Sequence, residues 1–326
     1  MLVLSARDVH RLLPYDECAG AMRAALATVA RGEARQPLRT VLKPAGAAGL
    51  MALMPSYLPG ESAGYGLKAI CITAANPAIG LDSHQGIVLL SSARTGEPLA
   101  VLNASAVTEI RTAAVSAVAT ELLARPDADV LAVVGTGVQA RAHLLAIAGA
   151  RTLAQVRVAG RDPAKAAAFA AIMRGQAGVP VTACDSAQST VAEAGIIVTA
   201  TSSAVPVLQR AWIGDGAHIN AVGACLPAAR ELDSETIAAA ALFADSRESV
   251  SAESGDYLLA LADGAIGPDH VQAEIGQLLT GAAPGRTDAG QITVFESLGL
   301  AVEDLAAAAL VYRKALEFGA GCEAEF

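Results

Sequence analysis

The sequence predicts an α/β protein that joins a parallel-sheet domain to an α+β domain. Before residue 124, short aliphatic runs are separated by Gly, Pro, Asn and Asp, which is typical of hairpin-connected strands. From Asp129 onward, apolar runs alternate with helical patterns, which is typical of βαβ units. The chain has 326 residues, of which 53% are hydrophobic and 17% charged. It can therefore bury two cores and is not a disordered protein.

The first part of the chain opens with helices. Ser5 and Asp8 form a capping-box pattern that begins a short helix ending at Leu13, and a longer helix is expected over 16–30. The strands of an antiparallel sheet are then expected over residues 38–42, 50–57, 66–73, 86–91 and 99–102. A helix over 105–123 follows this sheet.

The second part has the alternation of a parallel sheet. Its strands are expected over residues 130–134, 155–159, 179–182, 196–200, 218–222 and 241–244. Helices are expected over residues 137–148, 163–173 and 301–317. The last of these is expected to pack back onto the first domain.

Charge and cysteine usage exclude several classes of protein. The net charge of −9 and a pI near 5.1 argue against binding of nucleic acid. No apolar stretch is long enough to span a bilayer, and the first residues do not resemble a secretory signal. The cysteines are odd in number and never form C-x-x-C, so we expect reduced thiols, a cytoplasmic location and no metal site. They are Cys18, Cys71, Cys184, Cys225 and Cys322.

A glycine-rich turn between a strand and a helix predicts a dinucleotide site. Gly135, Gly137 and Ala140 form G-x-G-x-x-A directly after the apolar run 130–134. The first glycine permits the tight turn, the second lets a pyrophosphate approach the backbone, and the alanine allows close helix–strand packing. This context predicts a Rossmann-type parallel sheet domain.

The end of the second strand bears on the choice of dinucleotide. NAD enzymes usually carry a carboxylate there, whereas this sequence has Gly160 followed by Arg161 and Asp162. A guanidinium at this place suits the 2′-phosphate of NADP, so NADP is expected, with NAD as the alternative. In a second interpretation Arg161 is a solvated loop residue and Asp162 caps the next helix.

The first domain offers cations as candidate ligand-binding residues. Lys68 lies within an apolar strand, where a lysine either reaches an edge or faces a ligand. Arg111 lies in an apolar helical pattern, and Arg39 and Arg94 lie in loops or at strand ends. These positions alone do not decide between ligand binding and solvation.

Taken together, the motifs resemble the ornithine cyclodeaminase/mu-crystallin family over nearly the whole chain. The stretches that carry the resemblance are Met54-Pro55, Gly66-Leu-Lys68, Asn76 with Gly80-Leu81, Thr95-Gly-Glu-Pro98, Thr108-Glu-Ile-Arg-Thr-Ala-Ala114, Gly135-Thr-Gly-Val-Gln-Ala140, Thr199-Ala-Thr-Ser202, His218-Ile-Asn-Ala-Val-Gly223, Arg230-Glu-Leu-Asp233, and Val294-Phe-Glu-Ser-Leu-Gly299 before Asp304. The resemblance implies a homodimer with a substrate-binding and dimerisation domain of residues 1–124 and 302–326. Residues 125–301 would form the NAD(P)-binding domain.

The resemblance also implies roles for individual residues. Arg39, Lys68 and Arg111 fall where family members hold the carboxylate of an amino or imino acid, and Lys68 can protonate the reacting nitrogen. For Thr201 and Asn220, ordinary hydrogen bonding at strand ends is the alternative role. The residues expected to contact the nucleotide are Ser83, Arg111, Gly135, Gly137, Val138, Gln139, Arg161, Thr201, Asn220, Val222 and Ser297.

One position departs from the family pattern and bears on the reaction. Family cyclodeaminases and alanine dehydrogenases carry an aspartate where this chain has Cys225, and the cyclodeaminase lysine four positions later is Ala229. A thiol is a poor general base at neutral pH, so Cys225 is either a catalytic-site thiol or a small residue packed beside the nicotinamide. Ketimine reductases of the family also lack the aspartate.

We therefore expect an NAD(P)H-dependent reductase that converts a cyclic imino acid, a ketimine such as Δ1-pyrroline-2-carboxylate, to the L-amino acid. The alternatives are an ornithine cyclodeaminase that forms L-proline and ammonia with NAD, or an alanine or opine-type amino acid dehydrogenase. A non-catalytic ligand-binding protein is a further alternative, because some relatives have that role.

Overall fold

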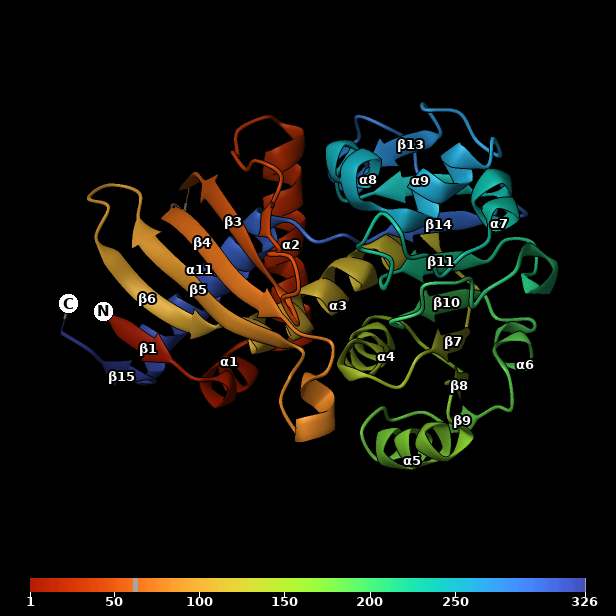
Figure 1. Cartoon of the computed structure of the whole chain (residues 1–326), viewed down its shortest axis with the longest axis horizontal. Coiled ribbons are helices and arrows are strands. Elements are labelled where there is room, and N and C mark those ends of the chain that lie inside the picture. The colour runs from red at the N-terminus through yellow and green to blue at the C-terminus, as the bar shows by residue number, and fades with distance from the viewer. Residues whose placement is uncertain (61–63, 326) are drawn as a thin grey trace. The chain divides into compact units, whose positions relative to one another are not determined.

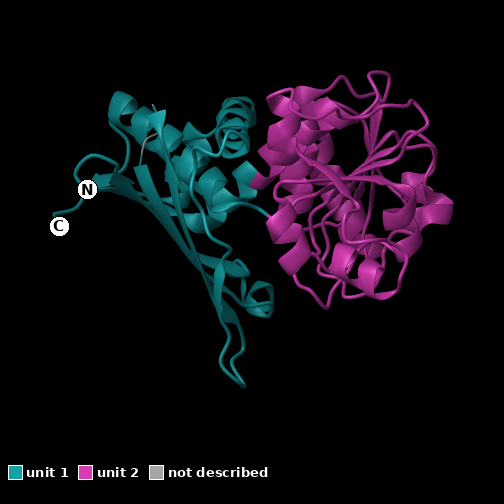
Figure 2. Ribbon diagram, turned by 90° about the horizontal axis from the view of Figure 1, so that it is seen from above, with its two compact units in different colours: residues 1–111, 299–326 teal, residues 112–298 magenta. Residues whose placement is uncertain are grey.

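The computed structural model describes residues 1–60 and 64–325, which form two compact units (Figures 1 and 2). Unit 1 comprises Met1–Arg111 and Gly299–Phe326, and unit 2 comprises Thr112–Leu298. The first boundary between the two units falls inside one helix. The boundary predicted from the sequence lies after residue 124. Within the described ranges, no helix is long and apolar enough to cross a membrane. The expected cytoplasmic location stays a prediction.

Unit 1 is built on a seven-stranded sheet in the order β15-β1-β6-β5-β4-β3-β2. Its strands are β1 (Leu2–Leu4), β2 (Thr40–Leu42), β3 (Leu50–Leu58), β4 (Gly64–Ile72), β5 (His84–Ser92), β6 (Pro98–Asn103) and β15 (Cys322–Glu323). Its helices are α1 (Ala6–Leu12), α2 (Tyr15–Ala30), the short 3₁₀ helix η2 (Asn76–Ile79), the first turns of α3 (Ala104–Leu123), and α11 (Ala301–Phe318).

The predicted antiparallel sheet is correct for β2 to β6 but wrong for the edge of the sheet. There β1 pairs in parallel with β6, and β15 pairs antiparallel with β1. Strands of two or three residues are too short to show an alternating pattern, so these two strands are not predictable from the sequence. The capping box predicted for α1 is confirmed, because Ser5 Oγ accepts from the Asp8 amide and Asp8 Oδ2 accepts from the Ser5 amide.

One face of the unit 1 sheet is covered by α11 (Figure 1). Residues 64, 66, 68 and 70 of β4 are buried and alternate with more exposed neighbours, as period-two geometry requires. Gly66 brings the strand and helix into close contact, since a Cβ there would lie 3.0 Å from the Cβ of Leu305. The glycine therefore sets how closely β4 approaches α11.

Unit 2 contains an eight-stranded, all-parallel sheet in the order β13-β12-β14-β11-β10-β7-β8-β9. Its strands are β7 (Val130–Val134), β8 (Gln155–Ala159), β9 (Val181–Ala183), β10 (Ile196–Thr199), β11 (His218–Ala221), β12 (Ala241–Ala244), β13 (Val271–Glu274) and β14 (Thr293–Glu296). Besides the rest of α3, its helices are α4 (Val138–Ala150), α5 (Pro163–Arg174), α6 (Ala187–Val191), η3 (Arg210–Trp212), α7 (Ser234–Ala239), α8 (Arg247–Glu253), α9 (Gly255–Ala262) and α10 (Ile275–Leu279).

Helices lie on both faces of this sheet (Figure 2), and the strands β9-β8-β7-β10-β11 follow the doubly wound order. The order of connection reverses between β7 and β10, which is where such folds bind nucleotides. The Rossmann-type prediction is therefore confirmed. The sequence did not predict β13 or β14, and β14 inserts between β11 and β12.

Candidate active site

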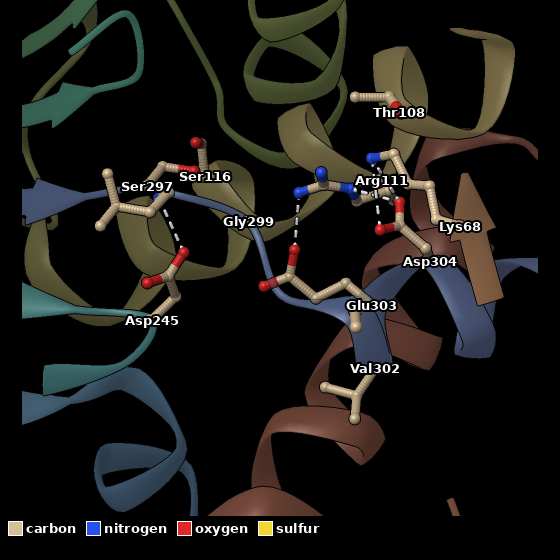
Figure 3. A network of polar contacts seen from close by, with 12 residues as sticks. Lys68, Thr108, Arg111, Ser116, Asp245, Ser297, Gly299, Val302, Glu303 and Asp304 are labelled. Atoms are coloured by element: carbon tan, nitrogen blue, oxygen red, sulfur yellow. Dashed lines mark hydrogen bonds and ion pairs between the residues drawn. The ribbon is translucent and has the colours of Figure 1, made fainter. Parts of the chain in front are cut away.

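Four charged side chains in unit 1 form a buried network of ion pairs (Figure 3). Lys68 extends from β4, Arg111 from α3, and Glu303 and Asp304 from the first turn of α11. Lys68 Nζ lies 3.2 Å from Asp304 Oδ1 and 3.3 Å from Oδ2. Arg111 donates from Nε to Asp304 Oδ1 at 3.0 Å and from Nη1 to Glu303 Oε2 at 2.7 Å. These side chains are at most 5% exposed, so water screens their charges weakly.

The start of α11 is arranged to hold its two carboxylates. The amide of Val302 donates to Gln36 Oε1 at 3.0 Å, and Ser56 Oγ donates to the carbonyl of Ala301 at 3.1 Å. These bonds tie the first residues of the helix to the segment before β2 and to β3. Acidic residues in a first helical turn are stabilised by the helix dipole. Glu303 and Asp304 therefore point toward the cations from a fixed position.

The network carries more positive than negative charge. Arg39, half-buried just before β2, donates from Nη2 to the carbonyl of Gly299 at 3.2 Å and acts electrostatically on Lys68. The three cations Arg39, Lys68 and Arg111 thus accompany two carboxylates. A carboxylate ligand would balance this charge, and arginine can bind one through two parallel hydrogen bonds.

The pKa of Lys68 is lowered to about 8. Burial is the main cause, because desolvation disfavours the ammonium ion, and the charges of Arg111 and Arg39 act in the same direction. Asp304 opposes them through its charge and its hydrogen bond. A lysine with this pKa can release and regain a proton near neutral pH.

His84, at the start of β5, is a further titratable group, and the charges of this network affect its pKa. Burial lowers its pKa first, followed by the charges of Lys68 and Arg111. Its Nδ1 lies 2.9 Å from the hydroxyl of Ser83, a residue predicted to contact the nucleotide. No role for His84 was predicted from the sequence.

Gly299 is needed for Arg111 to occupy its position. Its φ is +81°, and a Cβ at this residue would lie 2.4 Å from Arg111 Nη1 and 2.6 Å from Nη2. A side chain here would therefore collide with a guanidinium that Glu303 and Asp304 already hold.

The glycine-rich turn of unit 2 has the features that its motif predicts. Gly135 has a φ of +135°, and a Cβ there would lie 2.4 Å from the carbonyl oxygen of Ala200. A Cβ at Gly137 would meet no atom within 4 Å. Gly137 is the N-cap residue of α4, and no capping side chain accepts from the amides of the first turn. Amide groups in the first turn of α4 are thus available to an anion, and the turn fits the pyrophosphate of a dinucleotide.

Two charged residues follow β8, the arginine Arg161 and the aspartate Asp162. Asp162 accepts from the amides of Ala164 and Lys165 at 3.0 and 3.3 Å, so it caps α5 as the second interpretation expected. Arg161 is exposed and makes no hydrogen bond or ion pair with the described part of the chain. A Cβ at Gly160 would lie 2.9 Å from Thr136 Cγ2, so the turn itself covers this position.

One buried carboxylate joins the loops that follow β10 and β11. Glu231 Oε1 accepts from the amide of Thr201 at 2.6 Å, and Oε2 accepts from that of Gly223 at 2.7 Å. Burial raises the pKa of Glu231, and the hydrogen bonds partly oppose this. Asp256 Oδ1 in turn accepts from the amide of Glu231 at 2.8 Å. Glu231 thereby fixes two strand-end loops that carry predicted nucleotide contacts.

The remaining predicted residues of unit 2 differ in accessibility. Val138 is exposed, whereas Val222 and Ser297 are buried. Asn220 is fully buried and donates to Thr120 Oγ1 at 2.9 Å, which agrees with the alternative of strand-end hydrogen bonding. The thiol of Cys225 is partly buried and donates to the carbonyls of Val222 at 3.4 Å and Ser297 at 3.8 Å.

The structure therefore collects Arg39, Lys68 and Arg111 around α11 and places the glycine-rich turn at the carboxyl ends of the parallel strands. Glu303, Glu231 and the role of Asp304 were not predicted from the sequence. Asp304 and Glu231 do stand within or beside matched motifs, which was the available signal. Over residues 1–60 and 64–325, no three His, Cys, Asp or Glu side chains are grouped so that they could hold a metal ion.

Comparison with known proteins decides the family. Residues 1–319 match the ornithine cyclodeaminase/mu-crystallin family. The chain belongs to this family. It is 41% identical to the ketimine reductase mu-crystallin of Mus musculus over 294 residues, which cover 89% of this chain and 90% of the relative.

Two solved structures of the family have the same fold over at least 99% of this chain. One is the Thermococcus litoralis Δ1-pyrroline-2-carboxylate reductase in complex with NADH and L-proline, with a TM-score of 0.96 and 37% identity over 99% of this chain and 100% of that one. The other is an archaeal alanine dehydrogenase dimer with bound NAD, with a TM-score of 0.94 and 32% identity over 100% and 99% of the two chains.

Proposed function

We propose that this chain is an NAD(P)H-dependent reductase of a cyclic imino acid and converts a ketimine such as Δ1-pyrroline-2-carboxylate to the L-amino acid. The observation that carries the proposal is the buried network of Lys68, Arg111 and Asp304 with Arg39 beside it. A dry site with excess positive charge suits a small carboxylate. The names of the mouse ketimine reductase and of the Thermococcus litoralis reductase support the same reaction class.

In this reaction Arg39 and Arg111 bind the substrate carboxylate and so orient the imine. Lys68, held by Asp304, donates a proton to the imine nitrogen and regains one from water. When bound, a reduced nicotinamide would supply the hydride for C2 and would be oxidised in return. The C=N double bond thus becomes a CH–NH single bond, and the nitrogen and carbon have each gained one hydrogen.

The reaction is tested by following NADPH oxidation with Δ1-pyrroline-2-carboxylate through the loss of nicotinamide absorbance. We expect turnover by the wild type and a loss of about 100-fold or more in Lys68→Ala, since general acid catalysis contributes about 10²–10⁴-fold. Lys165→Ala, which changes an exposed lysine on α5, is the matched control. Absence of turnover by the wild type with both NADPH and NADH would contradict the proposal.

We propose NADP as the preferred dinucleotide. Arg161 is exposed beside Gly160, and the adjacent carboxylate of Asp162 is engaged in capping α5. The loss of a charged hydrogen bond, about 1.5–3 kcal/mol, corresponds to roughly a 10- to 150-fold loss in NADPH affinity. Arg161→Ser should show this loss and leave the NADH affinity unchanged. An equal change for both nucleotides would contradict the preference.

We propose that the chain forms a homodimer through the sheet face opposite α11. Met51, Leu53 and Ile87 on this face are 36–45% exposed, and Leu53 and Ile87 each pair with Ala69 of β4. Exposed apolar patches of this kind usually mark interfaces. The dimeric alanine dehydrogenase of the family supports the same assembly. Light scattering should give twice the chain mass for the wild type and the chain mass for Leu53→Lys with Ile87→Lys.

The cyclodeaminase and alanine or opine dehydrogenase activities are the competing functions. A cyclodeaminase needs a base where this chain has Cys225, whose thiol donates to two carbonyls. Incubation with L-ornithine and NAD should therefore yield no L-proline, and pyruvate with ammonia should be reduced far more slowly than the cyclic imine. Product analysis by mass spectrometry separates these outcomes.

A further inference from the structure

Asp304 is the one carboxylate that contacts both Lys68 and Arg111 among the described residues of this network. Its two oxygens lie 3.2 and 3.3 Å from Lys68 Nζ, and Oδ1 also accepts from Arg111 Nε at 3.0 Å. It is 1% exposed. The proton donor and a carboxylate-binding arginine of the proposed reaction are therefore bonded to the same side chain (Figure 3).

We propose that Asp304 is a positioning residue for the imine reduction, an inference that rests on the proposed function. Its carboxylate fixes the Lys68 ammonium and the Arg111 guanidinium as one unit, so the group that donates the proton keeps a set position relative to the group that binds the substrate carboxylate. In this role Asp304 acts through Lys68 and Arg111, the two side chains that it bonds.

The surroundings of Lys68 show why this carboxylate matters. Arg111 from α3, Arg39 from the segment before β2, and His84 from β5 are the basic groups near it, while Asp304 and Glu303 come from α11. Burial lowers the pKa of Lys68, and the two arginines lower it further. Asp304 is the group that raises it, through both its charge and its hydrogen bond. Glu303 bonds to Arg111 and not to Lys68.

Removing the charge of Asp304 should therefore make Lys68 lose its proton at lower pH. An opposite charge at this distance shifts a pKa by about 1–3 pH units, so Asp304→Asn should move the Lys68 midpoint down by at least about one pH unit. Because the proton donor must be protonated, the basic limb of the kcat/KM profile should move down equally.

The Lys68 midpoint is measurable without any activity. The chain has four lysines, Lys43, Lys68, Lys165 and Lys314, so protein labelled with 13C at Cε gives four signals, and Lys68→Arg identifies the one from Lys68. In the wild type we expect this signal to titrate near pH 8, and at lower pH in Asp304→Asn. Glu303→Gln is the matched control and should leave the midpoint in place.

The geometric part of the proposal is tested by Asp304→Glu. This variant keeps the negative charge but displaces the oxygens by about 1 Å, which can cost up to about 10²-fold in a catalytic site. We expect an unchanged basic limb with kcat reduced about 10- to 100-fold. This variant also serves as the probe if Asp304→Asn does not fold.

Two results would overturn the inference: an unchanged Lys68 midpoint in Asp304→Asn, or wild-type kcat in Asp304→Glu. A wild type that shows the low Lys68 midpoint but reduces no cyclic imine would instead overturn the proposed function. The failure of one proposal is therefore distinguishable from the failure of the other.

Discussion

Gly299→Ala should displace the Arg111 guanidinium and weaken substrate binding. The new Cβ would lie 2.4 Å from Nη1, which now donates to Glu303 at 2.7 Å. Asp304 holds the same guanidinium at Nε, so it cannot swing aside without losing a charged hydrogen bond. The substitution thus affects the site only by displacing Arg111, since Gly299 has no side chain that could bind the substrate.

The magnitude follows from two terms. An L-residue in the left-handed region, with φ at +81°, costs about 1–2 kcal/mol. Loss of one hydrogen bond between charged groups costs about a further 1.5–3 kcal/mol. We expect the free energy of unfolding to fall by the sum, about 2.5–5 kcal/mol. The second term alone corresponds to roughly a 10- to 150-fold lower kcat/KM for the imino acid.

Gly319→Ala is the matched control for this experiment. Gly319 ends α11 with a φ of +61°, and a Cβ there would meet no atom within 4 Å. Gly319→Ala should lower the free energy of unfolding only by the cost of the left-handed backbone, about 1–2 kcal/mol, and should leave kcat/KM unchanged. Urea unfolding monitored by circular dichroism and NADPH oxidation kinetics give the two quantities. Equal effects of the two alanine substitutions on both quantities would refute the reasoning.

Three further predictions concern other parts of the structure. Glu231→Gln leaves one of the Thr201 and Gly223 amides without a carboxylate acceptor, so the KM for NADPH should rise about tenfold or more in initial-rate titrations. The pKa of Asp256 is raised to about 7, mainly by burial, so the folded state holds a proton that the unfolded chain releases above about pH 4. Stability should therefore fall as pH rises from 4 to 7, and Asp256→Asn should flatten this dependence in urea titrations. Gly66→Ala brings a Cβ to 3.0 Å from α11 and should cost about 1–3 kcal/mol by thermal denaturation, whereas a wild-type Tm would contradict the close packing.

Local patterns predicted most of the secondary structure because their causes are local. The Ser5–Asp8 box, the run over β7 and the turn at Gly135 each depend on residues that are neighbours in sequence. The insertion of β14 between β11 and β12 does not. A parallel strand pairs with residues far along the chain, and the four residues of β14, Thr-Val-Phe-Glu, do not identify its partners.

The site was predicted in part for the same reason. Lys68 and Arg111 were found because their motifs match the family, but their acidic partners are 236 and 193 residues away at Asp304. No spacing rule links such distant residues, and an Asp in a first helical turn is also what a helix dipole alone favours. The pairing becomes visible only when β4, α3 and α11 are placed together.

The discontinuous make-up of unit 1 has a consequence for synthesis on the ribosome. Lys68 and Arg111 are made early, but the helix that supplies their carboxylates is made only after all of unit 2. Until α11 emerges, Lys68 and Arg111 lack their carboxylate partners and one apolar face of the nascent sheet is uncovered. Unit 2 is by then fully synthesised. Unit 2 should therefore fold first during synthesis. A chain that stalls before Gly299 should expose an incompletely folded, aggregation-prone unit 1 to chaperones and proteases.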